Sequence, residues 1–285
     1  MQHIFGIDHL ALLVRDLESA STAYEKLGFR VSARQLHSAN MGSANHIFNF
    51  SNSYVELIGL IAETDFNKPW LARLGKREGL YIISTRTDDV AGAVSELRQK
   101  GISTSDSVPH SRPAMLASGE QSRVSFGVTY VDAEFTPAAH ISVCEHHDPD
   151  KVYCADREQH ANTATSIKTV IISTPTPLEV AEAYLPIYGN DAIIEKSTEK
   201  VILSTAVEDA NIEFMTSSSI RHSLGIQEDI IIPDNVPFAV VFEVSDIDRT
   251  TKQLDDNNIP KQLTRDSVLV PATHAAGTMI VFSPC

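Results

Sequence analysis

Four short segments of the chain share one spacing of apolar and polar residues. Each has an apolar anchor, a second small or apolar residue three positions later, a third anchor seven positions after the first, and Gly or Asn at position eleven. Because seven residues make about two helical turns, the anchors of each segment lie on one face of an amphipathic helix. Gly and Asn are typical of the residue that ends a helix. The four sets are Leu17, Ala20, Tyr24, Gly28; Val90, Ala93, Leu97, Gly101; Leu178, Ala181, Leu185, Gly189; and Ile247, Thr250, Leu254, Asn258.

The segments around these helices also repeat. An apolar run of strand character precedes each helix, namely HLALLV, LYIIST, TVIIST and FAVVFEV. Three more strand-like segments follow the first helix (RVSARQL, NHIFNF and SYVELIGLI) and the third (AIIEK, KVILST and NIEFMT). The repeated unit is therefore β-α-β-β-β, and four such units in 285 residues average about 71 residues each. The pattern predicts an α+β fold of four βαβββ modules.

The modules are unevenly spaced, and the spacing predicts two halves. The first anchors of successive helices lie 73, 88 and 69 residues apart, and the long middle interval contains the polar stretch HHDPDKVYCADREQHANTATS. A polar stretch of this kind suits a connection between paired modules. We expect a first pair of modules over residues 1–147, a linker over residues 148–165 and a second pair over residues 166–285.

Charge and composition limit the classes of partner. The chain has 23 Lys and Arg against 37 Asp and Glu, a net charge of −14, which disfavours nucleic acid and anionic membrane surfaces. Its longest apolar runs are shorter than the roughly 18 residues that cross a bilayer. The first residues lack the features of a secretory signal, and three cysteines are too few for a disulfide framework. These features predict a cytoplasmic protein that binds a small molecule, with a homodimer left open.

Two motifs carry a resemblance to a known family. The opening DHLALLVRDLESASTAYEKLGF and the later SYVELIGL, set in βαβββ modules, resemble the vicinal oxygen chelate superfamily. This superfamily contains glyoxalase I, bleomycin-resistance proteins and extradiol dioxygenases, and the glyoxalase-like branch is the most similar. The resemblance implies that each pair of modules closes into a half-barrel cup around a small ligand. It also implies a divalent metal at the floor of the cup.

The resemblance further implies which residues hold the metal. Its ligand positions, in the first and last strands of each module, fall on His9 and Glu56 in the first module. In the second module the last strand offers Glu145, whereas the first-strand position falls on Ile82, which cannot bind a metal. An imidazole and two carboxylates suit a divalent Mn, Fe, Ni or Zn ion and leave positions for substrate. Glu56 and Glu145 are then also the candidates for proton transfer.

The second pair of modules retains fewer of these residues. Val170 and Ala239 stand at the two first-strand positions, and only Glu213 matches a ligand position of the first pair. We therefore expect an active cup in the first half of the chain.

Other polar residues are candidates for contacts with a ligand. His140 and Arg112 could contact an anion or a carbonyl group, and His46 could line the cup. Asn45 and His46 point to opposite faces of their strand, so only one of them can face inward. His146 or His147 could replace Glu145, and these three residues together with His160 could form a separate site. Trp70 could cover the pocket or pack in an interface.

Three functions remain open on the sequence. The first is a metal-dependent lyase, isomerase or dioxygenase that uses His9, Glu56 and Glu145. The second is a metal-free protein that sequesters a small molecule, as bleomycin-resistance proteins do. The third is a structural dimer module without a ligand.

Overall fold

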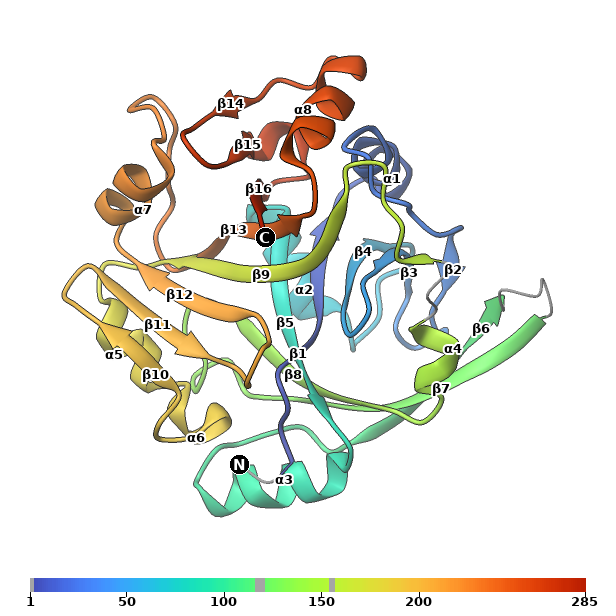
Figure 1. The fold of residues 1–285 in the computed structure, drawn as a ribbon. Helices are drawn as coiled ribbons and strands as arrows, with labels where there is room; N and C mark the ends of the chain where they lie inside the picture. Colours follow the sequence, from blue (N-terminus) through green and yellow to red (C-terminus); the bar gives the residue numbers. More distant parts are fainter. Residues whose placement is uncertain (1–2, 116–120, 154–156) are drawn as a thin grey trace.

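The computed structural model describes residues 3–115, 121–153 and 157–285, and its strands form two sheets. The eight strands of the first half are ordered β2-β3-β4-β1-β5-β8-β7-β6, and those of the second half are ordered β10-β11-β12-β9-β13-β16-β15-β14. The two orders are the same once eight is added to each strand number. The sequence repeat is therefore a repeat of topology (Figure 1).

In the first half the elements are β1 (Ile7–Val14), α1 (Leu17–Lys26), β2 (Gln35–Leu36), β3 (Ser43–Asn49), β4 (Tyr54–Leu60), α2 (Lys68–Lys76), β5 (Gly79–Thr87), α3 (Val90–Gln99), β6 (Val108–Met115), β7 (Gln121–Tyr130) and β8 (His140–His146). The connection contains α4 (Pro149–Val152). In the second half they are β9 (Ala164–Ser173), α5 (Pro177–Glu182), α6 (Leu185–Tyr188), β10 (Ile193–Lys196), β11 (Lys200–Ser204), β12 (Asn211–Met215), α7 (Ser217–Leu224), β13 (Val236–Val244), α8 (Ile247–Asp256), β14 (Gln262–Leu263), β15 (Val268–Val270), η2 (Ala272–His274) and β16 (Met279–Pro284).

Each sheet is built from two modules joined at their first strands. β1 pairs in parallel with β4, β5 pairs in parallel with β8, and β1 and β5 pair antiparallel at the centre of the first sheet. β9, β12, β13 and β16 repeat this arrangement in the second sheet. The predicted α+β fold of four βαβββ modules, paired into two curled half-barrels, is confirmed.

Three of the four predicted helices, α1, α3 and α8, begin and end where the sequence pattern predicts. Asp16, Asp89 and Asp246 cap α1, α3 and α8, and each side chain accepts a hydrogen bond from the backbone N–H three residues later. Such caps stabilise a helix by about 1 kcal/mol. The predicted stop residues all have positive φ angles, which only Gly and Asn adopt easily: Gly28 (92°), Gly101 (81°), Gly189 (109°) and Asn258 (54°).

The third helix differs from the prediction. The expected single helix divides into α5 and α6, and Pro186 lies in the first turn of α6. Proline lacks the N–H that would continue the helix from α5, so the chain breaks there and starts a new turn. Leu178, predicted as an anchor, is 38% exposed, whereas Val180 and Ala181 are buried.

The two halves are held together by a shared aromatic core. Phe29 of the first half lies 5.0 Å from Phe242 of the second, between ring centroids. The backbone N–H of Leu80 donates to the Thr278 hydroxyl at 2.7 Å. A Cβ on Gly79 would lie 2.6 Å from the carbonyl oxygen of Gly277, so the halves approach too closely there for a side chain. The division at residues 1–147, 148–165 and 166–285 stays a prediction, because one hydrophobic cluster contains residues of both halves.

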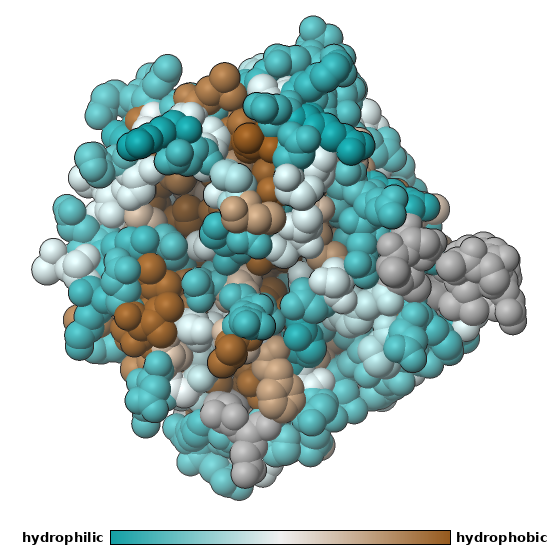
Figure 2. Space-filling model, viewed as in Figure 1, coloured by the Kyte–Doolittle hydropathy of each residue, from teal (hydrophilic) through white to brown (hydrophobic). Residues whose placement is uncertain are grey.

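The visible surface is mostly hydrophilic, with hydrophobic residues gathered over β10 and β11 (Figure 2). Ile194, on the edge strand β10, is 61% exposed. Among the described residues, no helix has both the length and the apolar character needed to cross a membrane.

Candidate functional site

The cup of the first half contains a small, partly open cavity of about 50 Å³. That volume is enough for one or two water molecules. One end of the cup is filled by apolar residues, among them Trp70 and Leu74 of α2. At the other end polar side chains face the cavity from β1, the loop before β3, β4 and β8, namely His9, His37, Glu56, Ser142, Cys144 and His146.

An irregularity in β1 brings two consecutive polar residues to this end. Ile7 pairs with Thr85 and His9 pairs with Ser84, so Asp8 is an extra residue with no partner position on β5. Regular alternation would point Asp8 and His9 to opposite faces, but a β-bulge can turn the extra side chain toward its neighbour. The Oδ1 atom of Asp8 lies 2.5 Å from Nδ1 of His9.

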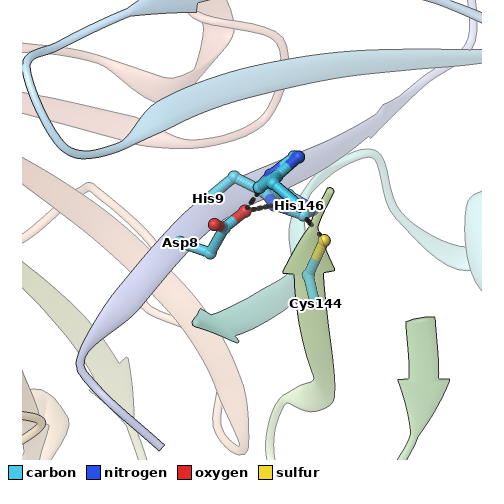
Figure 3. Close-up of side chains that lie close together, drawn as sticks. All are labelled: Asp8, His9, Cys144 and His146. Carbon is cyan, nitrogen blue, oxygen red and sulfur yellow. Dashed lines mark hydrogen bonds and ion pairs between the residues drawn. The ribbon is translucent and has the colours of Figure 1, made fainter. Parts of the chain in front are cut away.

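Asp8 is the centre of a buried hydrogen-bond network (Figure 3). It is 0% exposed, and Oδ1 also lies 3.1 Å from Nε2 of His146, while the Tyr153 hydroxyl donates to Oδ2 at 2.6 Å. Burial opposes ionisation of Asp8, but His146 and His9 outweigh it and lower the pKa of the carboxyl well below its usual range. Burial and Asp8 raise the pKa of Tyr153, which therefore stays a hydrogen-bond donor.

Glu56 forms the opposite wall of the cavity. Its Oε1 atom lies 3.1 Å from Nε2 of His37 and also accepts a hydrogen bond from the Asn45 amide. Burial would raise the pKa of Glu56, but the hydrogen bond and charge of His37, with His9 and Asn45, lower it to about 2. Glu56 is thus a buried carboxylate that stays ionised at neutral pH.

His9 lies between the two carboxylates. Its Nδ1 atom faces Asp8, and its Nε2 atom lies 4.0 Å from Oε2 of Glu56. The ring stacks on Tyr54 with centroids 4.6 Å apart, which fixes its plane. A metal bound about 2.1 Å from both a histidine nitrogen and a carboxylate oxygen spans up to about 4.2 Å, so one ion can bridge His9 and Glu56.

Glu145 lies on the other face of the sheet. Its carboxylate accepts a hydrogen bond at 3.0 Å from the N–H of Val90, at the start of α3, and lies 3.6 Å from His147. On β8 the side chains alternate, so Cys144 and His146 face the cavity while Glu145 faces the helix. The structure therefore brings together His9 and Glu56 of the predicted ligands, with His146 in place of Glu145.

The residues predicted to contact a ligand take different positions. His46 faces α1, where its Nδ1–H donates to the Ser32 carbonyl at 2.7 Å and its Nε2 lies 3.6 Å from Glu18. Its neighbour Asn45 is the one that points toward Glu56. The side chain of Arg112, on β6, lies outside the described part of the structure.

His140 lies between two tyrosine rings that pack against the apolar residues of the cup. Its ring stacks on Tyr81 and Tyr130, with centroids 5.4 and 5.3 Å apart. Burial lowers the pKa of His140 to about 4. A neutral imidazole sandwiched in this way is suited to packing more than to binding an anion.

The separate site that Glu145, His146, His147 and His160 could form is not assembled in the described part of the structure. His160 accepts a hydrogen bond from the N–H of Arg30 and contacts the Asn49 carbonyl, both at 3.0 Å, on the opposite side of β3. His147 is exposed beside Glu145, whereas His146 belongs to the Asp8 network.

Sequence reasoning missed four residues of the site. Asp8 is recruited by the bulge, Tyr153 comes from the connection after β8, and His37 lies in a loop, so none of the three follows from strand alternation. Cys144 could have been found, because it lies two residues before His146 on the same face of β8.

The topology and the pair His9 and Glu56 define a vicinal-oxygen-chelate protein with two half-barrels. The sequence profile described as the glyoxalase-like domain matches residues 7–188, and the chain belongs to this family. A comparison with curated proteins finds no match.

One solved structure shares the fold over nearly the whole chain, and others are similar over about half of it. A hypothetical protein from Staphylococcus aureus has a TM-score of 0.69 at 11% identity, with 98% of this chain and 99% of that chain covered. Methylmalonyl-CoA epimerase of Streptomyces coelicolor, in complex with 2-nitronate-propionyl-CoA, has a TM-score of 0.40 at 21% identity, over 50% of this chain and 99% of that one. Methylmalonyl-CoA epimerase from Mycobacterium tuberculosis has a TM-score of 0.38 at 17% identity, over 49% and 87%. The full-length similarity is one of fold.

Proposed function

We propose that the first half of the chain binds a small oxygen-rich metabolite in its cup and acts on it with a divalent metal, as a lyase, isomerase or dioxygenase. One observation carries the proposal: the His9 imidazole is held between two buried carboxylates, 2.5 Å from Asp8 and 4.0 Å from Glu56. A histidine that binds a metal through one nitrogen usually donates its other N–H to a carboxylate, and His9 has a carboxylate on each side.

The donor set of the cavity fits such a metal. Imidazole nitrogen, carboxylate oxygen and a thiol, contributed by His9, His146, Glu56, Asp8 and Cys144, are ligands of divalent first-row metals. Bound there, the ion would supply a Lewis acid that polarises a substrate oxygen. Its identity among Mn, Fe, Ni and Zn is part of the proposal.

The chain's own residues bind and orient. Asp8 fixes the His9 ring, and Tyr153 and His146 fix Asp8. A carboxylate whose pKa is about 2 accepts protons poorly at neutral pH. We therefore assign Glu56 to the attraction of positive charge in the cavity more than to proton transfer. His37, in contact with Glu56 at 3.1 Å, connects that carboxylate to the outside of the cup.

A second depression marks the access route that we propose. It has a volume of about 440 Å³ and lies between β2 and β6, where His37 and His110 belong to its wall. His37 also lines the inner cavity, so the two spaces share this side chain. The inner cavity is smaller than the roughly 300 Å³ of ordinary ligand pockets, so a ligand must displace His37 or part the edges of β2 and β6.

Elemental analysis of the purified protein, with thermal unfolding before and after chelation, tests the proposal. We expect about one divalent ion per chain, a lower unfolding temperature after chelation, and loss of the metal in His9→Ala. Thr169→Ala is the matched control and should keep the metal, because strand pairing puts Thr169, and not the predicted Val170, at the position of β9 that corresponds to His9. Absence of metal in a protein that neither chelator nor His9→Ala affects would rule out the metal-dependent function.

Metal-free binding of a small molecule is the second candidate. It is favoured by the second module, where Ile82 and Ser142 line the cavity at the positions that match His9 and Glu56 of the first. Two of the four usual ligand positions then hold an aliphatic side chain and a hydroxyl. A metabolite that raises the unfolding temperature equally with and without chelator would favour this candidate.

A further inference from the structure

His9 can bind a metal on only one of its two sides. Each nitrogen of a neutral imidazole is either a donor or a lone pair, so a metal on one nitrogen leaves the other to donate to a carboxylate. The structure offers both arrangements, since Asp8 faces Nδ1 and Glu56 faces Nε2. The side with the better set of further ligands decides between them.

The Glu56 side is poor in further ligands. Oε1 of Glu56 is already engaged by His37 and Asn45. The cavity residues that the second module places at the matching positions are Ile82 and Ser142. A metal on this side would have His9 and one oxygen of Glu56 as its strong protein ligands.

The Asp8 side is rich in ligands. One donor atom from each of Asp8, His9, Cys144 and His146 can be chosen so that all four lie within 4.8 Å of one another (Figure 3). Oδ1 of Asp8 lies 3.1 Å from Nε2 of His146, which lies 3.8 Å from the sulfur of Cys144. Ligands at 2.0–2.3 Å from a tetrahedral zinc ion are separated by roughly 3.3–3.8 Å. The two distances to His146 are close to this spacing, whereas Oδ1 of Asp8 and Nδ1 of His9, 2.5 Å apart, must separate by about 1 Å to admit the ion.

Local backbone structure holds these donors in place. Cys144 and His146 are two residues apart on β8 and therefore share a face of the sheet. The bulge in β1 adds Asp8 beside His9. Tyr153 donates to Oδ2 of Asp8 at 2.6 Å and leaves Oδ1 directed at the other donors, which is the way that ligating carboxylates are oriented.

The charges also balance on this side. Asp8 is 0% exposed and Cys144 is 1% exposed, and a buried charge needs a partner of opposite sign. A carboxylate, a thiolate and two neutral imidazoles carry two negative charges, which one divalent cation neutralises.

We propose that the metal lies on the Asp8 side of His9, held by Asp8, His9, Cys144 and His146. This inference rests on the proposed function only in that the cup binds a metal. The thiolate makes the site selective for Zn²⁺, Co²⁺ and Fe²⁺ over Mn²⁺ and Mg²⁺. Oε2 of Glu56 then lies 4.0 Å from Nε2 of His9, and Glu56 remains in the cavity as a charged group toward the ligand.

Cobalt spectroscopy tests the assignment without an assay of activity. The chain is freed of metal with chelator, titrated with Co²⁺ under reducing conditions, and followed for the near-ultraviolet charge-transfer absorption that only a thiolate–cobalt bond gives. We expect one equivalent to produce the band, and Zn²⁺ to displace it. Cys144→Ser should abolish the band and His146→Gln should weaken cobalt binding at least about 10-fold, while Glu56→Gln should keep the band.

The other two cysteines provide matched controls. Cys285→Ser and Cys154→Ser should leave the band unchanged, and circular dichroism verifies that each variant is folded. Cobalt that binds without the band, and is lost in Glu56→Gln but kept in Cys144→Ser, would overturn the inference and leave the proposed function standing. A folded chain that binds neither Co²⁺ nor Zn²⁺ would overturn the inference, and one that also binds none of Mn²⁺, Fe²⁺ and Ni²⁺ would overturn the proposed function as well.

Discussion

The two halves of the molecule have one topology and two kinds of cup. In each half a helix follows the last strand of the leading module and packs into the cup, α2 in the first half and α7 in the second. In the second half apolar side chains pack inside the cup, and the far end holds Thr169 and the ion pair of Glu213 with Lys200. The apolar residues include Ile171, Met215, Ile220, Phe238, Val241, Leu269 and Met279. In the first half the far end instead holds the buried polar side chains of His9, Glu56, Cys144 and His146, which line one cavity.

Corresponding positions show how the difference arises. His9 lies two residues before the partner of Glu56 on β1, and Thr169 lies two residues before the partner of Glu213 on β9. Glu213 is paired with Lys200 at 3.2 Å, toward solvent, whereas Glu56 is enclosed with His37. The second half thus keeps the strand pattern and has lost the buried polar network.

The difference between the cups indicates that the buried charges of the first cup are not there for stability. Burying ionisable groups costs several kcal/mol per charge unless they are well paired, and apolar replacements are often neutral or stabilising. In the second half the cup has an apolar interior and a partly exposed ion pair at its far end in place of the buried charges. Buried charges kept only in the first cup are therefore best explained by binding or catalysis.

Replacing His9 should have the largest effect on the difference in metal binding between the two cups. His9→Ala removes the residue between the two carboxylates, and we expect divalent-metal affinity to fall by at least about 100-fold, more than for loss of an outer hydrogen bond. Isothermal titration with Zn²⁺ measures the effect. Thr169→Ala should change the affinity less than twofold; an equal loss in both variants would refute the assignment of metal binding to the first cup.

Glu56 should dominate the acid stability of the first cup. Its pKa of about 2 lies below the ordinary value of 4.5, so its stabilising contribution is present above pH 4.5 and is lost as the pH falls toward 2. The contribution is on the order of 3 kcal/mol, and Glu56→Gln should remove this part of the pH dependence from urea unfolding curves. Unchanged acid dependence in Glu56→Gln would contradict the buried, ionised carboxylate.

Glu213 provides the comparison in the second cup. Glu213→Gln removes a partly exposed ion pair with Lys200 and should cost less than about 1 kcal/mol at neutral pH.

Removing the Tyr153 hydroxyl tests whether Asp8 must be held by this hydrogen bond for metal to bind. Tyr153→Phe takes away the donor to Oδ2 of Asp8, and metal affinity should fall about 10–100-fold. Tyr184→Phe removes a buried hydroxyl that donates to the Pro137 carbonyl at 2.8 Å, so it should cost similar stability and leave metal affinity unchanged. If the two variants bind metal equally well, Tyr153 does not position the site.

The smallest expected effect concerns His140. Burial lowers its pKa to about 4, below the ordinary 6.5, so its stabilising contribution is present above pH 6.5 and is lost as the pH falls toward 4. His140→Phe keeps the stack between Tyr81 and Tyr130. Between neutral pH and about pH 5.5, the free energy of unfolding should fall by about 1 kcal/mol less in this variant than in the wild type. A variant with the wild-type pH dependence would show that His140 is not held neutral.

The fold could be predicted from the sequence because local signals repeat. Three Asp caps and four residues with positive φ mark the helices, and apolar runs mark the first strands. The break at Pro186 was missed because the anchor spacing continued through it.

The site could be predicted only in part. His9 and Glu56 follow from regular positions in β1 and β4, and the structure places them in one cavity. Asp8 depends on a bulge that no local signal in the sequence marks, and Tyr153 and His37 come from connections whose paths are set by tertiary packing. Glu145 stays a prediction as a ligand, although side-chain alternation on β8 turns it toward α3 while His146 faces the cavity.

The most direct test of the account is a crystal structure of the chain grown with Zn²⁺, with anomalous diffraction at the zinc edge. The account predicts a single strong anomalous peak in the first cup, within about 2.0–2.3 Å of an imidazole nitrogen of His9. A cup without a peak in zinc-saturated crystals, or a peak in the second half-barrel instead, would contradict it.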